Sequence, residues 1–148
     1  MITKTTHSLF AVILALLLFI VPMPSNANTV DYSIDTGFGI PYGTLGIRGS
    51  IYTDNLRFRL ALGFLGAGIG GDVLVTDHVS IGGTYASALP YENVRVLNLT
   101  YHFNSRFDEG WSLGLDLGEA DEYCGLNCTQ ETRETNRPII FFHAGYLF

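Results

Sequence analysis

Apolar and polar positions alternate with a period of two along most of this chain. In residues 30–40, VDYSIDTGFGI, the apolar residues from Val30 to Ile40 fall on even positions, and aspartate, serine and glycine fall on odd ones. Successive side chains of a strand point to opposite faces, so this alternation predicts β-strands with one apolar face. No segment after residue 27 repeats its apolar positions with the period of a helix.

Turn-forming residues divide the alternating stretches into eight predicted strands. Asp54-Asn55, Asp77-His78 and Pro90 are typical of such turns. The predicted strands cover residues 30–40, 43–52, 56–64, 67–76, 79–87, 93–103, 111–118 and 138–148. Longer connections are predicted at 88–92, 104–110 and 119–137. The strand lengths are close to the ~9–11 residues that a tilted membrane strand needs.

The alternation alone leaves open whether the apolar face points into a barrel, as in a lipocalin-like soluble binder, or away from it. The polar face is rich in glycine and lacks lysine, which is unusual for a surface in water. The apolar face carries bulky side chains such as Phe58 and Trp111, and an eight-stranded interior is only just wide enough for side chains to fill. We therefore expect the apolar face to meet lipid, in an all-β fold that is an eight-stranded antiparallel up-and-down transmembrane β-barrel.

Aromatic residues gather near both ends of the predicted strands. The group near the end that holds both barrel termini comprises Tyr101, Phe103, Trp111, Tyr146 and Phe148. The group near the opposite end, where Pro41-Tyr42 is expected to turn the chain, comprises Phe38, Tyr42, Phe64 and Tyr85. Two such groups predict the aromatic girdles found at the two interfaces of a membrane barrel.

Residues 1–27 are typical of a secretory signal peptide. Lys4 precedes an unbroken apolar run from Leu9 to Val21, and Ser25-Asn26-Ala27 supplies small residues for cleavage. The run is shorter than the about 20 residues of a membrane helix, which argues against the alternative of an uncleaved anchor. We expect residues 28–148 to form a single barrel domain.

The last residues, PIIFFHAGYLF, resemble the C-terminal strand of bacterial outer-membrane barrels, in which alternating apolar residues and a final Phe are read by the assembly machinery. With the signal peptide and the strand pattern, residues 28–148 resemble the OmpA/OmpX-like superfamily of small eight-stranded outer-membrane barrels. The resemblance implies a monomer in the outer membrane of a Gram-negative bacterium, surrounded by membrane lipid and lipopolysaccharide. It also implies insertion by the barrel-assembly machinery, with Tyr146 and Phe148 as the assembly signal.

Composition narrows the range of partners. The net charge of −6 at pH 7 argues against nucleic acid as a partner. Cys124 and Cys128 lie close together in a polar stretch, and we expect them to form a disulfide in an oxidising compartment. Two thiols without a nearby histidine pair are weak support for the alternative of a metal site, so we expect neither a metal nor a cofactor.

The polar face of the predicted barrel carries charged residues of both signs. They are Asp31, Asp35, Arg48, Arg57, Arg59, Asp72 and Asp116, accompanied by His102 and His143. Because unpaired buried charges are costly, we expect a network of ion pairs and hydrogen bonds that fills the interior. The alternative is a narrow, porin-like pore or a small-solute site within the same charged interior.

The leading functional hypothesis is a non-enzymatic barrel with a structural or surface-interaction role. The polar loop 119–137 is its expected contact surface, for a ligand that the sequence does not identify. A third hypothesis is a lipid-modifying enzyme, because outer-membrane lipid A deacylases carry a His-x-Ser-Asn arrangement. The nearest string here is His102-Phe103-Asn104-Ser105, in which the serine is one position late and would face away from the histidine, so we expect no catalytic residues.

Overall fold

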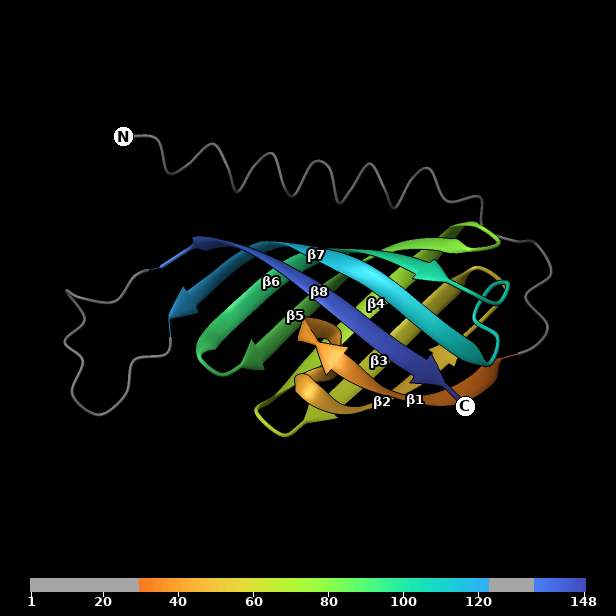
Figure 1. The fold of residues 1–148 in the computed structure, drawn as a ribbon, viewed down its shortest axis with the longest axis horizontal. Helices are drawn as coiled ribbons and strands as arrows, with labels where there is room; N and C mark the ends of the chain where they lie inside the picture. Colours follow the sequence, from red (N-terminus) through yellow and green to blue (C-terminus); the bar gives the residue numbers. More distant parts are fainter. Residues whose placement is uncertain (1–29, 123–134) are drawn as a thin grey trace.

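The computed structural model describes residues 30–122 and 135–148. Eight antiparallel strands, each hydrogen-bonded to its neighbours in sequence, form a closed barrel in which β8 pairs with β1 (Figure 1). The strands are β1 (Asp31–Gly39), β2 (Thr44–Tyr52), β3 (Leu56–Gly63), β4 (Gly66–Thr76), β5 (Val79–Ala88), β6 (Tyr91–His102), β7 (Gly110–Glu122) and β8 (Arg137–Leu147). The predicted eight-stranded antiparallel up-and-down barrel is therefore confirmed as the fold.

Two predicted connections are shorter in the structure than the sequence suggested. Only Leu89 and Pro90 separate β5 from β6, so the predicted loop 88–92 is a tight turn. β7 continues to Glu122 and β8 begins at Arg137, so both ends of the predicted loop 119–137 are strand. The error arises because polar residues on outward-facing strand positions beyond the apolar belt cannot be distinguished from a loop by polarity alone.

The two faces of the barrel wall have opposite character. Large apolar side chains point outward, and they include Leu62 and Phe142, which are 76 % and 71 % exposed. Charged and hydrogen-bonding side chains point inward, and Arg57 and Asp72 are each only 1 % exposed. Among the described residues, no helix is long and apolar enough to span a membrane.

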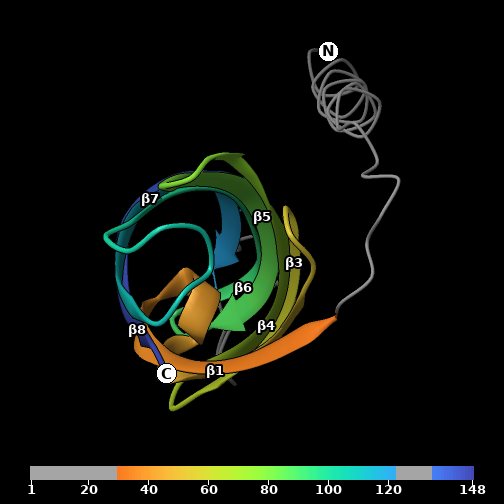
Figure 2. The ribbon, with the colours of Figure 1, turned by 90° about the vertical axis from the view of Figure 1, so that its right-hand side faces the viewer.

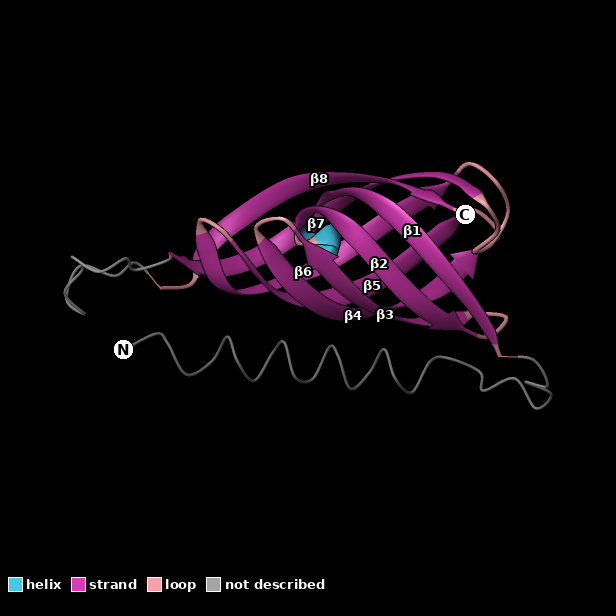
Figure 3. Ribbon diagram, turned by 90° about the horizontal axis from the view of Figure 1, so that it is seen from below, coloured by secondary structure: helices cyan, strands magenta, loops and turns pink. Residues whose placement is uncertain are grey.

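The connection between β1 and β2 folds into the barrel instead of capping it. A short 3-10 helix, η1 (Ile40–Tyr42), lies within the ring of strands (Figures 2 and 3). Gly39 and Gly43 flank it with φ angles of 113° and 62°, in the region that favours glycine, and these residues let the chain turn inward and return. Ile40 and Tyr42 are consequently buried, at 4 % and 0 % exposure. The predicted position of Ile40 on the outward face is wrong, because β1 ends at Gly39, and Tyr42, predicted in the turn as part of an aromatic girdle, lies inside the barrel instead.

The opposite end of the barrel, which holds Phe148 and is called the C-terminal end below, is covered by the connection between β6 and β7. This connection crosses the opening in the view along the barrel (Figure 2). Phe107 in its centre is buried among interior side chains, with its ring centroid 5.8 Å from that of Tyr52 and 5.6 Å from that of His102. The predicted polar turn 104–110 therefore carries an aromatic residue that closes one end of the interior.

Candidate functional site

The interior of the barrel is filled by three groups of side chains. At the η1 end the group is apolar, and at the C-terminal end it is centred on Phe107 and His102. Between them lie three arginines and three aspartates, all buried. The apolar group consists of Ile40, Ala86, Ala88, Val94, Val96, Ala120 and Ile139. The central group, called the interior network below, is the candidate site.

The first part of the interior network joins β1, β2 and η1. Arg48 Nε donates to both carboxylate oxygens of Asp35, at 2.8 and 2.9 Å, and Arg48 Nη2 donates to Oδ2 at 2.6 Å. The Arg48 guanidinium also lies over the ring of Tyr42, 4.4 Å from its centroid. A planar guanidinium that is paired at its edge and stacked on its face is held in one orientation.

The second part joins β3 to β4 through one carboxylate. Asp72 Oδ2 accepts from Arg57 Nε at 3.0 Å, from Arg57 Nη2 at 2.9 Å and from Arg59 Nη1 at 2.8 Å. Arg57 also lies over the ring of Phe107, 4.4 Å from its centroid. The central ion pairs are thereby connected to the aromatic residue that closes the C-terminal end.

The network continues from Arg59 across β5 to β7 through polar side chains. Arg59 Nη2 donates to Thr84 Oγ1 at 2.8 Å and to Asn98 Oδ1 at 2.6 Å. Asn98 Nδ2 then donates to Asp116 Oδ1 at 2.6 Å. Asn98 thus accepts from a cation and donates to an anion, and it connects two charges that do not touch directly.

His143 completes the network on β8. Its Nδ1 lies 2.7 Å from Asp116 Oδ1, and its Nε2 lies 3.0 Å from Thr100 Oγ1. The order carboxylate, imidazole, hydroxyl has the spacing of a catalytic relay. All three residues are at most 2 % exposed, however. In this position the arrangement gives both ring nitrogens of His143 a partner and ties β6, β7 and β8 together, although Asp116 Oδ2 has no hydrogen-bond partner among the described residues.

His102 lies apart from this relay, near the C-terminal end. Its Nε2 is 3.0 Å from the hydroxyl of Ser80. Ser105, the serine of the string considered for an enzyme, is exposed and donates to Asp108 Oδ2 at 3.2 Å. His102 is therefore paired with a serine on β5 rather than with the one in its own turn.

One residue assigned to the interior by alternation lies elsewhere. Asp31 is exposed at the first position of β1, and it does not belong to the buried network. β8 pairs with β1 only from Asp35 to Phe38, so the start of β1 extends beyond the end of β8 and is not enclosed by it. Alternation specifies which face a residue occupies but not how far along the barrel it lies.

Several members of the network were not singled out from the sequence. Thr84, Asn98, Thr100 and Ser80 are all buried and hydrogen-bonded to its charged or imidazole groups. Each shares the inward parity of its strand, which is the signal that could have identified them. Tyr42 carried no such signal, because it lies outside the strands.

Large interior side chains lie against glycines. A Cβ on Gly37 would lie 2.7 Å from Cζ of Tyr42, and one on Gly145 would collide with the Tyr42 hydroxyl. A Cβ on Gly114 would likewise collide with the imidazole of His143. These inward-facing glycines thus leave the space that the rings of Tyr42 and His143 fill.

The charged residues near the η1 end of β6, β7 and β8 form a separate, exposed set. Arg95 Nη1 lies 3.4 Å from Glu119 Oε1, Asn93 Nδ2 donates to Asp121 at 3.0 Å, and Arg137 pairs with Glu122. Cys124 and Cys128, the predicted disulfide, lie outside the described residues, as does the rest of segment 123–134. No cluster of three or more His, Cys, Asp or Glu suited to a metal occurs in the described part of the chain.

No protein-family model matches the chain, and neither the curated proteins nor the solved structures gave a significant match. The fold is therefore defined by its own strand order and register, and any function must be argued from the faces of the barrel and the contacts within it.

Proposed function

We propose that this protein is a monomeric outer-membrane barrel with a filled interior and a structural or surface-interaction role, without catalytic activity. The observation that carries the proposal is the inverted polarity of the wall. Bulky side chains such as Phe58 and Leu62 cover the outside, whereas Asp35, Arg48 and Asp72 are buried inside. A soluble barrel has the reverse arrangement.

The physical cost of this arrangement differs between water and lipid. In water, each exposed apolar side chain forgoes the burial energy of about 25 cal/mol per Å². In hydrocarbon the same side chains are well solvated, and the pairing of β8 with β1 removes the open sheet edge that a lipid environment penalises. Membrane lipid and lipopolysaccharide are thus the proposed surroundings, and the barrel-assembly machinery is the proposed route of insertion.

The filled interior favours the structural role over the pore. Ile40 and its apolar neighbours occupy one end, the paired charges occupy the middle, and Phe107 occupies the other end. A solute would have to displace all three groups. The proposed contact surface is accordingly the η1 end, where β7 and β8 lead into segment 123–134 and present charged side chains such as Glu122 and Arg137.

The experiment that tests membrane insertion is gel mobility of the outer-membrane fraction with and without boiling. A closed barrel resists SDS until it is heated, so we expect the unboiled protein to migrate faster than the boiled one. A soluble periplasmic protein with unchanged mobility would contradict the proposal.

Two further measurements separate the structural role from its alternatives. We expect the wild type, Arg48→Ser and Arg57→Ser all to show no conductance above the baseline of a planar bilayer. If these arginines lined a pore, each substitution would change its conductance. We expect overexpression to leave the lipid A profile unchanged, whereas a lipid-modifying enzyme would alter it.

Deletion of residues 123–134 tests the contact surface, because it should abolish surface binding while the heat-modifiable barrel persists.

A further inference from the structure

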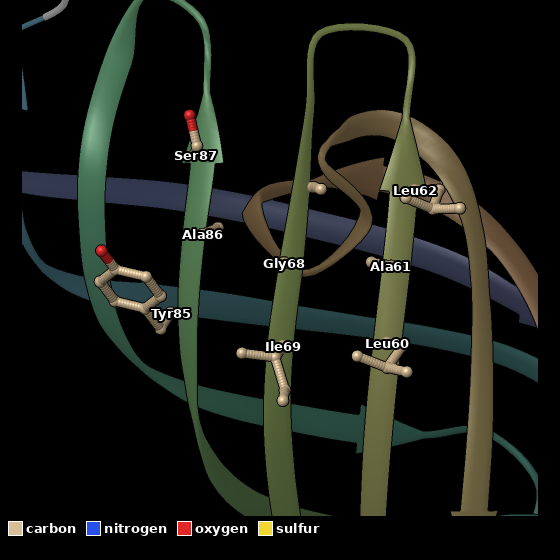
Figure 4. A pocket seen from close by; sticks show the side chains of 9 residues that line it. Leu60, Ala61, Leu62, Gly68, Ile69, Tyr85, Ala86 and Ser87 are labelled. Carbon is tan, nitrogen blue, oxygen red and sulfur yellow. The ribbon is translucent and has the colours of Figure 1, made fainter.

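The outer face of β3, β4 and β5 contains a hollow of about 420 Å³ (Figure 4). Two rows of outward side chains border it, each running across the three strands in register. The row nearer the centre of the barrel is Leu60, Ile69 and Tyr85, and the row nearer the η1 end is Leu62, Ala67 and Ser87.

The hollow exists because small residues meet on three adjacent strands. Ala67 and Ser87 are the small members of the row that Leu62 begins. The inward residues between the two rows, Gly68 and Ala86 among them, add little bulk to the wall. Ile40 and Ala86 belong to the same buried apolar cluster on the inner side of this part of the wall.

Polar groups lie on the β5 and β6 side of this otherwise apolar hollow. The Ser87 hydroxyl is on its η1-end row, and the Tyr85 hydroxyl donates to Asn93 Oδ1 at 2.8 Å. Arg95 lies directly opposite Tyr85 in the pairing of β5 with β6. Its guanidinium is half-exposed and forms a long ion pair with Glu119, at 3.4 Å. The hollow is therefore apolar on β3 and β4, and the hydroxyls of Tyr85 and Ser87 and the guanidinium of Arg95 lie on its β5 and β6 side.

We propose that this hollow binds an acyl chain of lipopolysaccharide, with Arg95 and Ser87 contacting a phosphate of the headgroup. The proposal rests on the membrane location argued above and adds a specific lipid site to it. Hydrocarbon fits the Leu60, Leu62 and Ile69 walls, and a planar guanidinium suits a phosphate at the chain's polar end.

The test is native mass spectrometry of the refolded, heat-modifiable barrel in mild detergent, titrated with rough lipopolysaccharide or with phosphatidylglycerol. We expect the wild-type protein to retain one lipopolysaccharide molecule. Ala67→Trp fills the hollow and should weaken retention about tenfold or more. Ala144→Trp is the matched control, since Ala144 faces outward on β8, between Phe38 and Leu113, away from the hollow. It should retain lipopolysaccharide as the wild type does.

A second pair of variants tests the headgroup contact. Arg95→Gln should reduce the preference for phosphorylated over dephosphorylated lipopolysaccharide, whereas Arg106→Gln, on the turn at the C-terminal end, should not. Equal retention by Ala67→Trp and the wild type would overturn the proposal, and equal retention of phosphatidylglycerol would show ordinary annular lipid instead. A protein that is not heat-modifiable contradicts the proposed membrane location, whereas an intact barrel that retains no lipopolysaccharide contradicts only the site.

Discussion

The imidazole of His143 occupies the space that a side chain on Gly114 would need. The two residues are direct partners in the pairing of β7 with β8, and Thr100 is the partner of Gly114 on its other side. The ring therefore lies across the glycine and reaches the Thr100 hydroxyl two strands away, at 3.0 Å. A glycine in the middle of a strand normally weakens it, and here its absence of a side chain is what connects β8 to β6.

This relationship predicts that Gly114→Ala destabilises the barrel by about 1–3 kcal/mol, the cost of overpacking a well-filled interior. The ring cannot move aside without breaking its bonds to Asp116 or Thr100. The measurement is urea unfolding in lipid vesicles, followed by the fluorescence of the single tryptophan, Trp111. Gly49→Ala is the control, because a Cβ on Gly49 meets nothing within 4 Å. Equal stability of the two variants would show that the interior is looser than described.

Asp72→Asn should destabilise the barrel far more than the loss of an exposed acid. Asp72 is the shared acceptor for Arg57 and Arg59, so its neutralisation leaves two buried cations without their anion. Breaking a buried pair costs about 3–5 kcal/mol. Glu119→Gln removes the partner of Arg95 at the surface, where both side chains are 41–48 % exposed, and should cost less than about 1 kcal/mol. The same unfolding assay compares the two, and similar losses would contradict the burial of the network.

Much of the fold could be predicted from the sequence because a β-barrel wall has one simple rule. Every strand faces two different surroundings, so the period of two marks both the strands and their faces. That rule predicts Asp35, Asp72 and Asp116 on the inward face, and all three are buried there.

The rule failed wherever the chain left the wall or extended beyond its neighbours. Ile40 continues the apolar alternation of β1 and Tyr42 follows in the predicted turn, but the backbone turns inward at Gly39, so both side chains fill the interior instead. Phe107 is a similar case in the β6–β7 connection. Side-chain partners such as Asn98 with Asp116 depend on register between strands, which one strand's pattern does not contain.

Phe107→Ala should cost about 3–5 kcal/mol, the usual loss for a buried aromatic residue. The substitution removes the ring that packs on Tyr52 and His102 and that lies under the Arg57 guanidinium. Glu109→Ala changes an exposed residue in the same connection and should stay within about 0.5 kcal/mol of the wild type. An equally small effect of Phe107→Ala would mean that the connection does not close the C-terminal end in the membrane.

Tyr42→Ala tests whether the interior is closed by one gate or by successive layers. It removes the ring that fits against Gly37 and Gly145 and stacks on Arg48, and it should cost about 3–5 kcal/mol in the unfolding assay. Tyr42→Phe keeps the ring and should lose no more than about 1.5 kcal/mol. Because Arg57, Arg59 and Asp72 still fill the middle and Phe107 the far end, we expect single-channel recordings of Tyr42→Ala to remain at the baseline. Steady current through Tyr42→Ala, absent from Tyr42→Phe, would contradict the layered interior and identify η1 as the only seal.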